Sequence, residues 1–105
     1  MNIKVVKSKL YSLVKKYIDA SVIGYSTDHW NIISIHSEGS IHEYVLMEFD
    51  PEDGRLWISK PYIVTLRNMF PVSDEVLKDI LKEWFEGKLD YTVFRVVYYE
   101  YEGED

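Results

Sequence analysis

The chain has 105 residues, of which 47% are hydrophobic and 29% are charged, with a formal net charge of −6 and no cysteine. This composition predicts one globular domain and excludes a disulfide framework, a thiolate metal site and a cysteine nucleophile. No apolar run approaches the roughly 18 residues of a membrane span, and no secretory signal is visible, so we expect a soluble, cytoplasmic protein that does not bind membranes. Glutamine is absent, which is typical of proteins from hot environments.

Residues 3–20 are expected to form a helix with a basic surface. Its apolar residues recur at intervals of three and four, which predicts one buried stripe. The stripe consists of Ile3, Val6, Leu10, Leu13 and Tyr17. Asn2 is the predicted N-cap, although residues 3–6 also suit a strand. The β-branched residues and Gly24 that follow Ala20 indicate that the helix ends near residue 19 or 20.

Residues 21–66 are predicted to form strands joined by tight turns. Four segments are rich in β-branched and aromatic residues, namely 21–26, 31–37, 41–49 and 55–59. The turn at residues 50–54, DPEDG, is the clearest, because it combines proline, local aspartate acceptors and a glycine that accepts positive φ. Pro61 is expected to break the sheet, with residues 62–66 continuing as a strand beyond it.

A second helix is predicted between Ser73 as N-cap and Gly87 just beyond its end. Asp74 and Glu75 suit its first turn, and its wide apolar surface predicts deep docking. Residues 89–102 then form a closing strand that is apolar on both faces. The order α-β-β-β-β-α-β predicts a single α+β domain over residues 1–105, with a mainly antiparallel sheet, two helices packed on one face and an acidic tail at 102–105.

No segment carries a catalytic or metal-binding motif. The segment YSTDHWN, residues 25–31, contains serine, aspartate and histidine, but these residue types are typical of a turn, and catalytic triads assemble from separated segments. The remaining candidates for an enzymatic site are His36 and His42, which flank a predicted hairpin turn, and Glu43, which alternates with apolar residues. The histidine spacing fits no zinc motif, so we predict no catalytic residue, no metal and no cofactor.

The charges are unevenly distributed, which suggests two kinds of partner. The first helix could bind nucleic acid through its lysines and stack a tyrosine on a base. The residues concerned are Lys4, Lys7, Lys9, Tyr11, Lys15 and Lys16. The net charge of −6 disfavours this function. The acidic run from Glu38 to Asp53 instead favours an inhibitor whose carboxylates imitate nucleic acid toward a host protein.

Nine tyrosines and three tryptophans exceed what so small a core can enclose. Because these residue types are enriched in protein interfaces, we expect one here. Its candidate residues are Trp30, Trp57, Tyr98, Tyr99 and Tyr101. The favoured function is therefore a small non-enzymatic accessory protein, of a kind common in viruses and mobile elements, that binds a protein partner or forms a homodimer through its sheet. Nucleic-acid binding and a small Glu/His enzyme are the alternatives.

Overall fold

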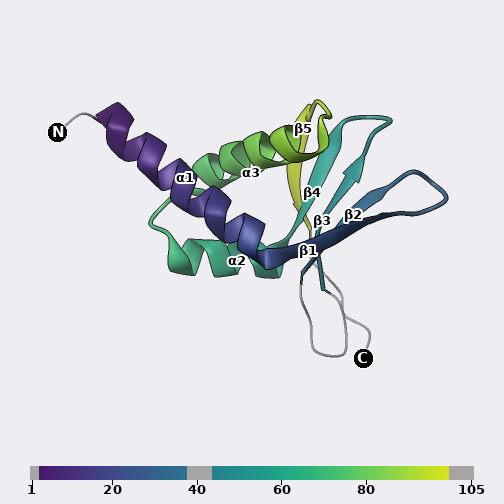
Figure 1. The fold of residues 1–105 in the computed structure, drawn as a ribbon, viewed down its shortest axis with the longest axis horizontal. Coiled ribbons are helices and arrows are strands. Elements are labelled where there is room, and N and C mark those ends of the chain that lie inside the picture. The colour runs from purple at the N-terminus through teal and green to yellow at the C-terminus, as the bar shows by residue number, and fades with distance from the viewer. Residues whose placement is uncertain (1–2, 38–43, 100–105) are drawn as a thin grey trace.

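The computed structural model describes residues 3–37 and 44–99 (Figure 1). The elements are α1 (Ile3–Ser21), β1 (Val22–Thr27), β2 (Ile33–Ser37), β3 (Tyr44–Asp50), β4 (Arg55–Ser59), α2 (Lys60–Met69), α3 (Asp74–Leu89) and β5 (Arg95–Tyr99). The predicted order of helices and strands is confirmed, with one helix more than expected. The acidic tail at 102–105 lies outside the described residues.

The five strands form one mixed sheet, and their order in space, β1-β2-β3-β4-β5, is their order in the chain. Neighbours from β1 to β4 are antiparallel, whereas β5 pairs with β4 in parallel. A parallel neighbour requires a crossover connection, which α2 and α3 provide together. The prediction of a mainly antiparallel sheet in an α+β fold is confirmed.

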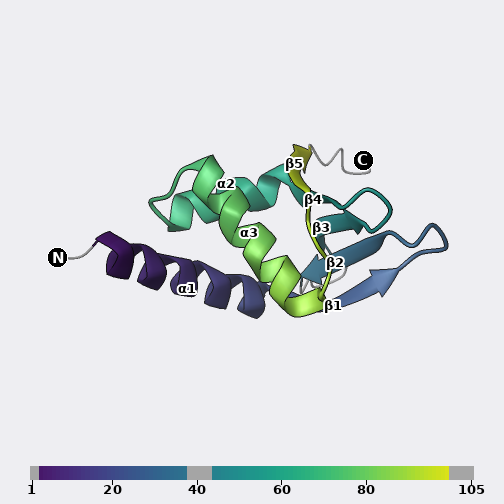
Figure 2. The same ribbon diagram turned by 90° about the horizontal axis from the view of Figure 1, so that it is seen from above.

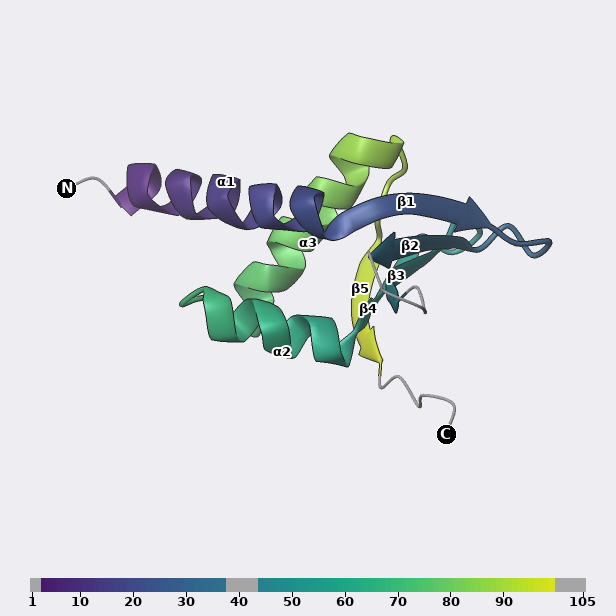
Figure 3. The same ribbon diagram turned by 60° about the horizontal axis from the view of Figure 1, so that its bottom comes forward.

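The helices occupy one half of an elongated molecule, and the sheet occupies the other half (Figure 2). α3 crosses between α1 and α2 and contacts both (Figure 3). The turn between β1 and β2 lies at the opposite end of the molecule from the start of α1, along an axis of 48 Å. The three helices and the sheet therefore enclose the core near the middle of the molecule.

One face of the sheet forms a wall of the hydrophobic core. The strand register places Ile33 opposite Phe49 and Phe49 opposite Leu56, so the buried side chains form continuous rows. The sheet contributes Ile33, Ile35, Met47, Phe49, Leu56 and Ile58, and the helices contribute Val14, Ile18, Ile63, Leu66, Leu77, Ile80, Leu81 and Phe85. The rings of Phe49 and Phe85 lie 4.6 Å apart, which joins β3 directly to α3.

The expected strand at residues 62–66 is wrong, because these residues lie in α2. Their β-branched composition favours a strand locally, but Tyr62, Ile63 and Leu66 are buried at helical spacing. Pro61 lies in the first turn of α2, where its missing N–H group has no helical partner to lose. The strand β4 ends at Ser59, just before Pro61, as expected, but the chain then continues as a helix and not as a further strand.

The predicted stripe of α1 is confirmed in part, because Leu10 and Tyr17 pack against the core. Val14 and Ile18 are fully buried, whereas Leu13, which was expected to be buried, is 57% exposed. The side chains of Ile3 and Val6, and Asn2, lie outside the described part of the chain. The helix ends at Ser21, one residue beyond the predicted range.

α3 begins as predicted but ends later. The Ser73 side chain accepts a hydrogen bond from the Val76 N–H, which confirms the predicted N-cap. The helix continues past Gly87 to Leu89 and ends at Asp90, whose φ of 56° is left-handed. β5 is shorter than expected, because it begins only at Arg95.

Candidate protein-binding site

The second face of the sheet, which we call the outer face, consists of the side chains that alternate with the buried rows. The register aligns Ser34 with Glu48, Glu48 with Trp57 and Trp57 with Val97 across four strands. The outer face comprises Ser26, Ser34, His36, Glu48, Asp50, Arg55, Trp57, Val97 and Tyr99, which are exposed or half-buried, and Ser59 beside Tyr99, which is buried. Most side chains of the outer face are therefore accessible to solvent among the described residues, in contrast with the buried rows of the core face.

Trp57 is the centre of an aromatic and cationic cluster on the outer face. Its ring lies 6.2 Å from the ring of Tyr99 on β5, and the Arg55 guanidinium carbon lies 5.7 Å from its centroid. Trp57 is 38% exposed, although it belongs to an inner strand of the sheet. Neighbours on both sides thus hold a large aromatic ring that remains available for contact, as an interface anchor requires.

A small recess lies beside Trp57. It has a volume of about 140 Å³ and is lined by Ile32, Glu48, Asp50 and Trp57. One Asp50 carboxylate oxygen accepts a hydrogen bond of 2.9 Å from the Glu52 N–H, so the β3–β4 turn fixes that side chain. The recess is smaller than the roughly 300 Å³ at which ligand pockets begin. Its size and its two carboxylates suit a single basic side chain.

The structure brings together two of the predicted interface residues, Trp57 and Tyr99, and separates the others. Tyr98 lies on the core side, where its hydroxyl donates a hydrogen bond of 3.0 Å to the Asp74 carbonyl oxygen. Burial, followed by the negative charge of Asp74, raises the pKa of Tyr98 to about 12. Trp30 lies in the β1–β2 turn and is 72% exposed, and Tyr101 lies outside the described residues.

The segment YSTDHWN divides between strand and turn. Tyr25, Ser26 and Thr27 belong to β1, and the turn follows them. The Asp28 carboxylate accepts hydrogen bonds from the N–H groups of Trp30 and Ile32, at 2.8 and 3.0 Å. Asn31 adopts a φ of 67°, a conformation that asparagine tolerates better than most residues. The prediction of a turn is confirmed for the second half of the segment.

Ser26 and His36 form the nearest approach to a catalytic arrangement. The Ser26 Oγ lies 2.6 Å from His36 Nε2, across the antiparallel pair β1–β2. His29 is closer to Ser26 in the sequence, but the strand register places His36 beside it. A serine nucleophile also needs donors for an oxyanion and exclusion of water, and the contact of Ser26 with His36 is exposed to solvent. The other predicted members of this site, His42 and Glu43, lie outside those residues.

Metal binding has no structural basis in the described part of the chain. No group of three or more histidine, aspartate and glutamate side chains within residues 3–37 and 44–99 is arranged to hold an ion. Within the same ranges, every helix is too short or too polar to cross a membrane.

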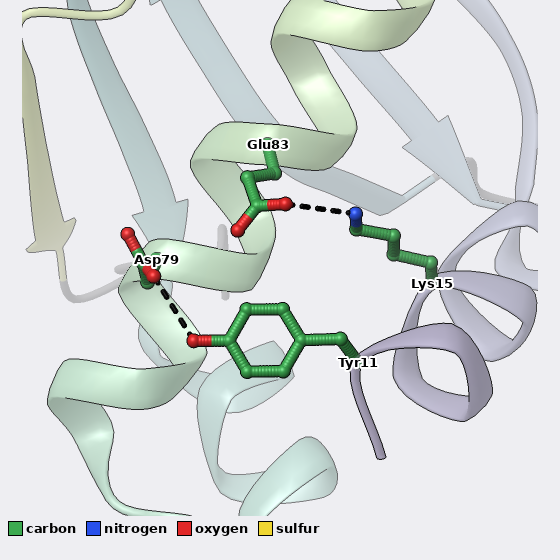
Figure 4. A network of polar contacts seen from close by, with 4 residues as sticks. All are labelled: Tyr11, Lys15, Asp79 and Glu83. Carbon is green, nitrogen blue, oxygen red and sulfur yellow. Dashed lines mark hydrogen bonds and ion pairs between the residues drawn. The ribbon is translucent and has the colours of Figure 1, made fainter. Parts of the chain in front are cut away.

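The lysine-rich helix is partly engaged within the protein (Figure 4). The Tyr11 hydroxyl donates a hydrogen bond of 3.0 Å to Asp79, and the Lys15 ammonium donates one of 3.0 Å to Glu83. Desolvation, then the Asp79 contact, raises the pKa of Tyr11. Nucleic-acid binding by Tyr11 or Lys15 would require these contacts with α3 to break. Lys9 and Lys16 are exposed, and the side chains of Lys4 and Lys7 are outside the described set.

Comparison with protein-family models, with curated proteins and with solved structures found no match to this chain. The outer face combines an accessible tryptophan, a tyrosine, an arginine and a recess lined by two carboxylates. Tryptophan, tyrosine and arginine are residue types that are enriched in protein interfaces.

Proposed function

We propose that this protein is a non-enzymatic protein-binding module whose outer face binds a basic segment of another protein. The observation that carries the proposal is the recess beside Trp57, where the carboxylates of Glu48 and Asp50 meet the indole ring. An arginine or lysine side chain favours such a site, because ion pairing and cation–π attraction act on the same cation. The net charge of −6 adds attraction at longer range.

The composition of the outer face supports a protein partner over nucleic acid. Tryptophan, tyrosine and arginine contribute most of the binding energy in many protein interfaces, and Trp57, Tyr99 and Arg55 are clustered here. A phosphate backbone would instead meet the negative charge of Glu48 and Asp50. A partner protein that itself binds nucleic acid would offer a protein surface to the aromatic cluster and basic side chains to the two carboxylates. The chain would then act as an acidic inhibitor, with its carboxylates in the place of phosphates.

Titration of ¹⁵N-labelled protein with a short arginine-rich peptide tests this proposal. The indole N–H signals of the three tryptophans report on binding, and we expect the signal of Trp57 to shift most. Glu48→Gln combined with Asp50→Asn should weaken the binding more than about tenfold, because both carboxylates of the recess lose their charge. Trp57→Ala should weaken it by a similar factor, because the recess loses its aromatic wall.

Glu75→Gln combined with Glu83→Gln is the matched control, because it removes the same charge from α3. Equal weakening by the two double variants would show that net charge alone attracts the peptide, and would contradict a defined site. A glutamate-rich peptide of equal length should leave the tryptophan signals unchanged. For the inhibitor form of the proposal, a nucleic-acid-binding protein captured by the outer face must release its DNA or RNA when this chain is added.

A further inference from the structure

β5 is an edge strand that offers its backbone for further pairing. It is the last strand in the sheet and pairs with β4 alone among the described strands. Alternate N–H and C=O groups of an edge strand point away from the sheet. Another extended segment can form a regular ladder of hydrogen bonds with them. The sequence of β5, RVVYY, consists largely of residues with high β propensity.

The two edge strands of the sheet, β1 and β5, differ in how well they are protected against pairing with a strand of another chain. In β1, at the opposite edge, the register with β2 shifts between Val22 and Gly24, and such a bulge disturbs regular pairing with a new strand. The register between β5 and β4 is continuous from Arg95 to Tyr99. β5 also contains no proline, and its one charged residue, Arg95, is at its first position. β5 is therefore the edge that is suited to accept a strand.

We infer that β5 pairs with β5 of a second copy of this chain, antiparallel and around a two-fold axis at Val97. A two-fold axis perpendicular to the sheet keeps the outer faces of both copies on the same side. Residues that lie opposite each other must then belong to the same face, so their sequence numbers differ by an even number. Centring on Val97 places Arg95 opposite the partner's Tyr99 on the outer face. It also places Val96 opposite the partner's Tyr98.

Charge and ring geometry select this register and this occupant. A strand with a cation at one end and an outer-face tyrosine at the other is complementary to its own antiparallel copy, because the two-fold axis gives two contacts, one between Arg95 and the partner's Tyr99 and one between Tyr99 and the partner's Arg95. Within β4, the Arg55 guanidinium carbon lies 5.7 Å from the Trp57 ring, so a contact between arginine and an aromatic ring already occurs on this face of the sheet. A register centred on residue 96 would face Arg95 with valine and lose both contacts.

The pairing would extend the outer face across two copies. Because Trp57 is aligned with Val97, the row across the joint becomes Trp57, Val97, and the partner's Val97 and Trp57. The resulting sheet would have ten strands, five from each copy, and two recesses related by symmetry. The inference depends on the edge of β5, and not on the proposed binding of a basic partner.

Light scattering on a gel-filtration column, over a concentration series, tests the inference. The wild type should elute at the mass of two chains, and Val97→Lys and Val97→Glu should each weaken self-association more than about tenfold, because like charges meet on the axis. A one-to-one mixture of these two variants should recover the dimer, because the introduced charges then have opposite sign. A monomeric wild type, or variants that associate as the wild type does, or no recovery in the mixture would each overturn the pairing at Val97.

A second measurement introduces no charge into the sheet. The natural chain has no cysteine, so Val97→Cys introduces one thiol at the axis. Opposed residues of antiparallel strands lie about 4.5–5.5 Å apart at Cα, within the range of a disulfide. Mild oxidation should link Val97→Cys into covalent dimers and leave Ser26→Cys on β1 largely unlinked, and equal linking of both would overturn the inference. Glu48→Gln combined with Asp50→Asn should leave the dimer intact, which separates this test from that of the proposed function.

Discussion

At the scale of single residues, Gly54 joins the β3–β4 turn to the beginning of β5. Its φ of 69° lies in the left-handed region, and its carbonyl oxygen accepts a hydrogen bond of 2.8 Å from the Phe94 N–H. A Cβ atom at position 54 would overlap the Phe94 ring, so the ring closes over the glycine. One small residue thus allows both the turn and the approach of the crossover chain to β4.

Gly54→Ala should destabilise the protein by about 1–3 kcal/mol, because the left-handed backbone and the displaced Phe94 ring both oppose it. Gly87→Ala is the matched control: Gly87 lies within α3, and a Cβ there would meet no atom within 4 Å. The control should stabilise by about 0.5–1 kcal/mol through helix propensity. Urea unfolding measures both changes, and a loss of stability in both variants would contradict this reasoning.

At the scale of elements, Asp19 connects the last turn of α1 to α3. Its Oδ1 accepts hydrogen bonds of 2.7 Å from Trp84 Nε1 and 3.1 Å from the Lys88 ammonium. The Trp84 hydrogen bond, supported by Lys88, holds the pKa of Asp19 below its ordinary value of 3.8. The docking of α1 on α3 therefore includes a contribution that requires the ionised carboxylate.

Asp19→Asn should lower the stability at pH 7 by about 1 kcal/mol, a modest value because the carboxylate is half exposed and screened by water. The folded-state pKa is lowered, so this contribution is complete above pH 3.8 and is lost as the pH falls through the folded-state pKa. The wild type and Asp19→Asn should therefore converge in strongly acidic solution. Urea unfolding at several pH values measures the difference, with Glu52→Gln as the control; a gap that persists in acid would contradict the assignment.

The elements that sequence analysis identified correctly are those with local chemical signals. Ser73 caps α3, and Asp50 and Gly54 form the β3–β4 turn, because caps and turns depend on a few adjacent residues. α2 was missed because its β-branched residues favour a strand locally, while burial against α3 and β4 makes them helical. Leu13 was misplaced because tertiary packing decides which side of α1 is buried.

The candidate site could be predicted only in part, for the same reason. The alternation of residues identifies Trp57 as an outward side chain in its strand, and the aromatic excess suggests an interface. The contact of Trp57 with Tyr99, however, depends on the parallel pairing of β4 with β5. That pairing requires the crossover through α2, which the sequence pattern did not reveal. The partnership of Ser26 with His36 likewise depends on strand register.

At the scale of the whole molecule, the central strands of the sheet pack against more of the core than the β1–β2 turn does. β3 and β4 have strands on both sides and contribute Met47, Phe49, Leu56 and Ile58 to the core. The β1–β2 turn extends away from the helices (Figure 2). Trp30 in this turn is 72% exposed, and Tyr25 in the preceding strand β1 is 52% exposed. The free energy of local opening should therefore decrease from the centre of the sheet toward this turn.

Native-state hydrogen exchange measures this gradient. We expect amides of Phe49 and Leu56 to exchange only through global unfolding, and amides of residues 26–33 to be protected at least about tenfold less. The reason is that the turn region has few buried side chains to hold its hydrogen bonds closed. Uniform protection across the sheet would show instead that all five strands open as one unit.

The parallel pairing of β4 with β5 also determines what the chain exposes while it is being made. β1 to β4 can leave the ribosome as a complete meander, but the strand that covers the far edge of β4 is synthesised only after both crossover helices. During that interval the nascent chain presents an apolar strand with unpaired backbone groups. A ribosome that pauses between residues 60 and 94 would hold the chain in the state most prone to pair with a neighbouring nascent chain.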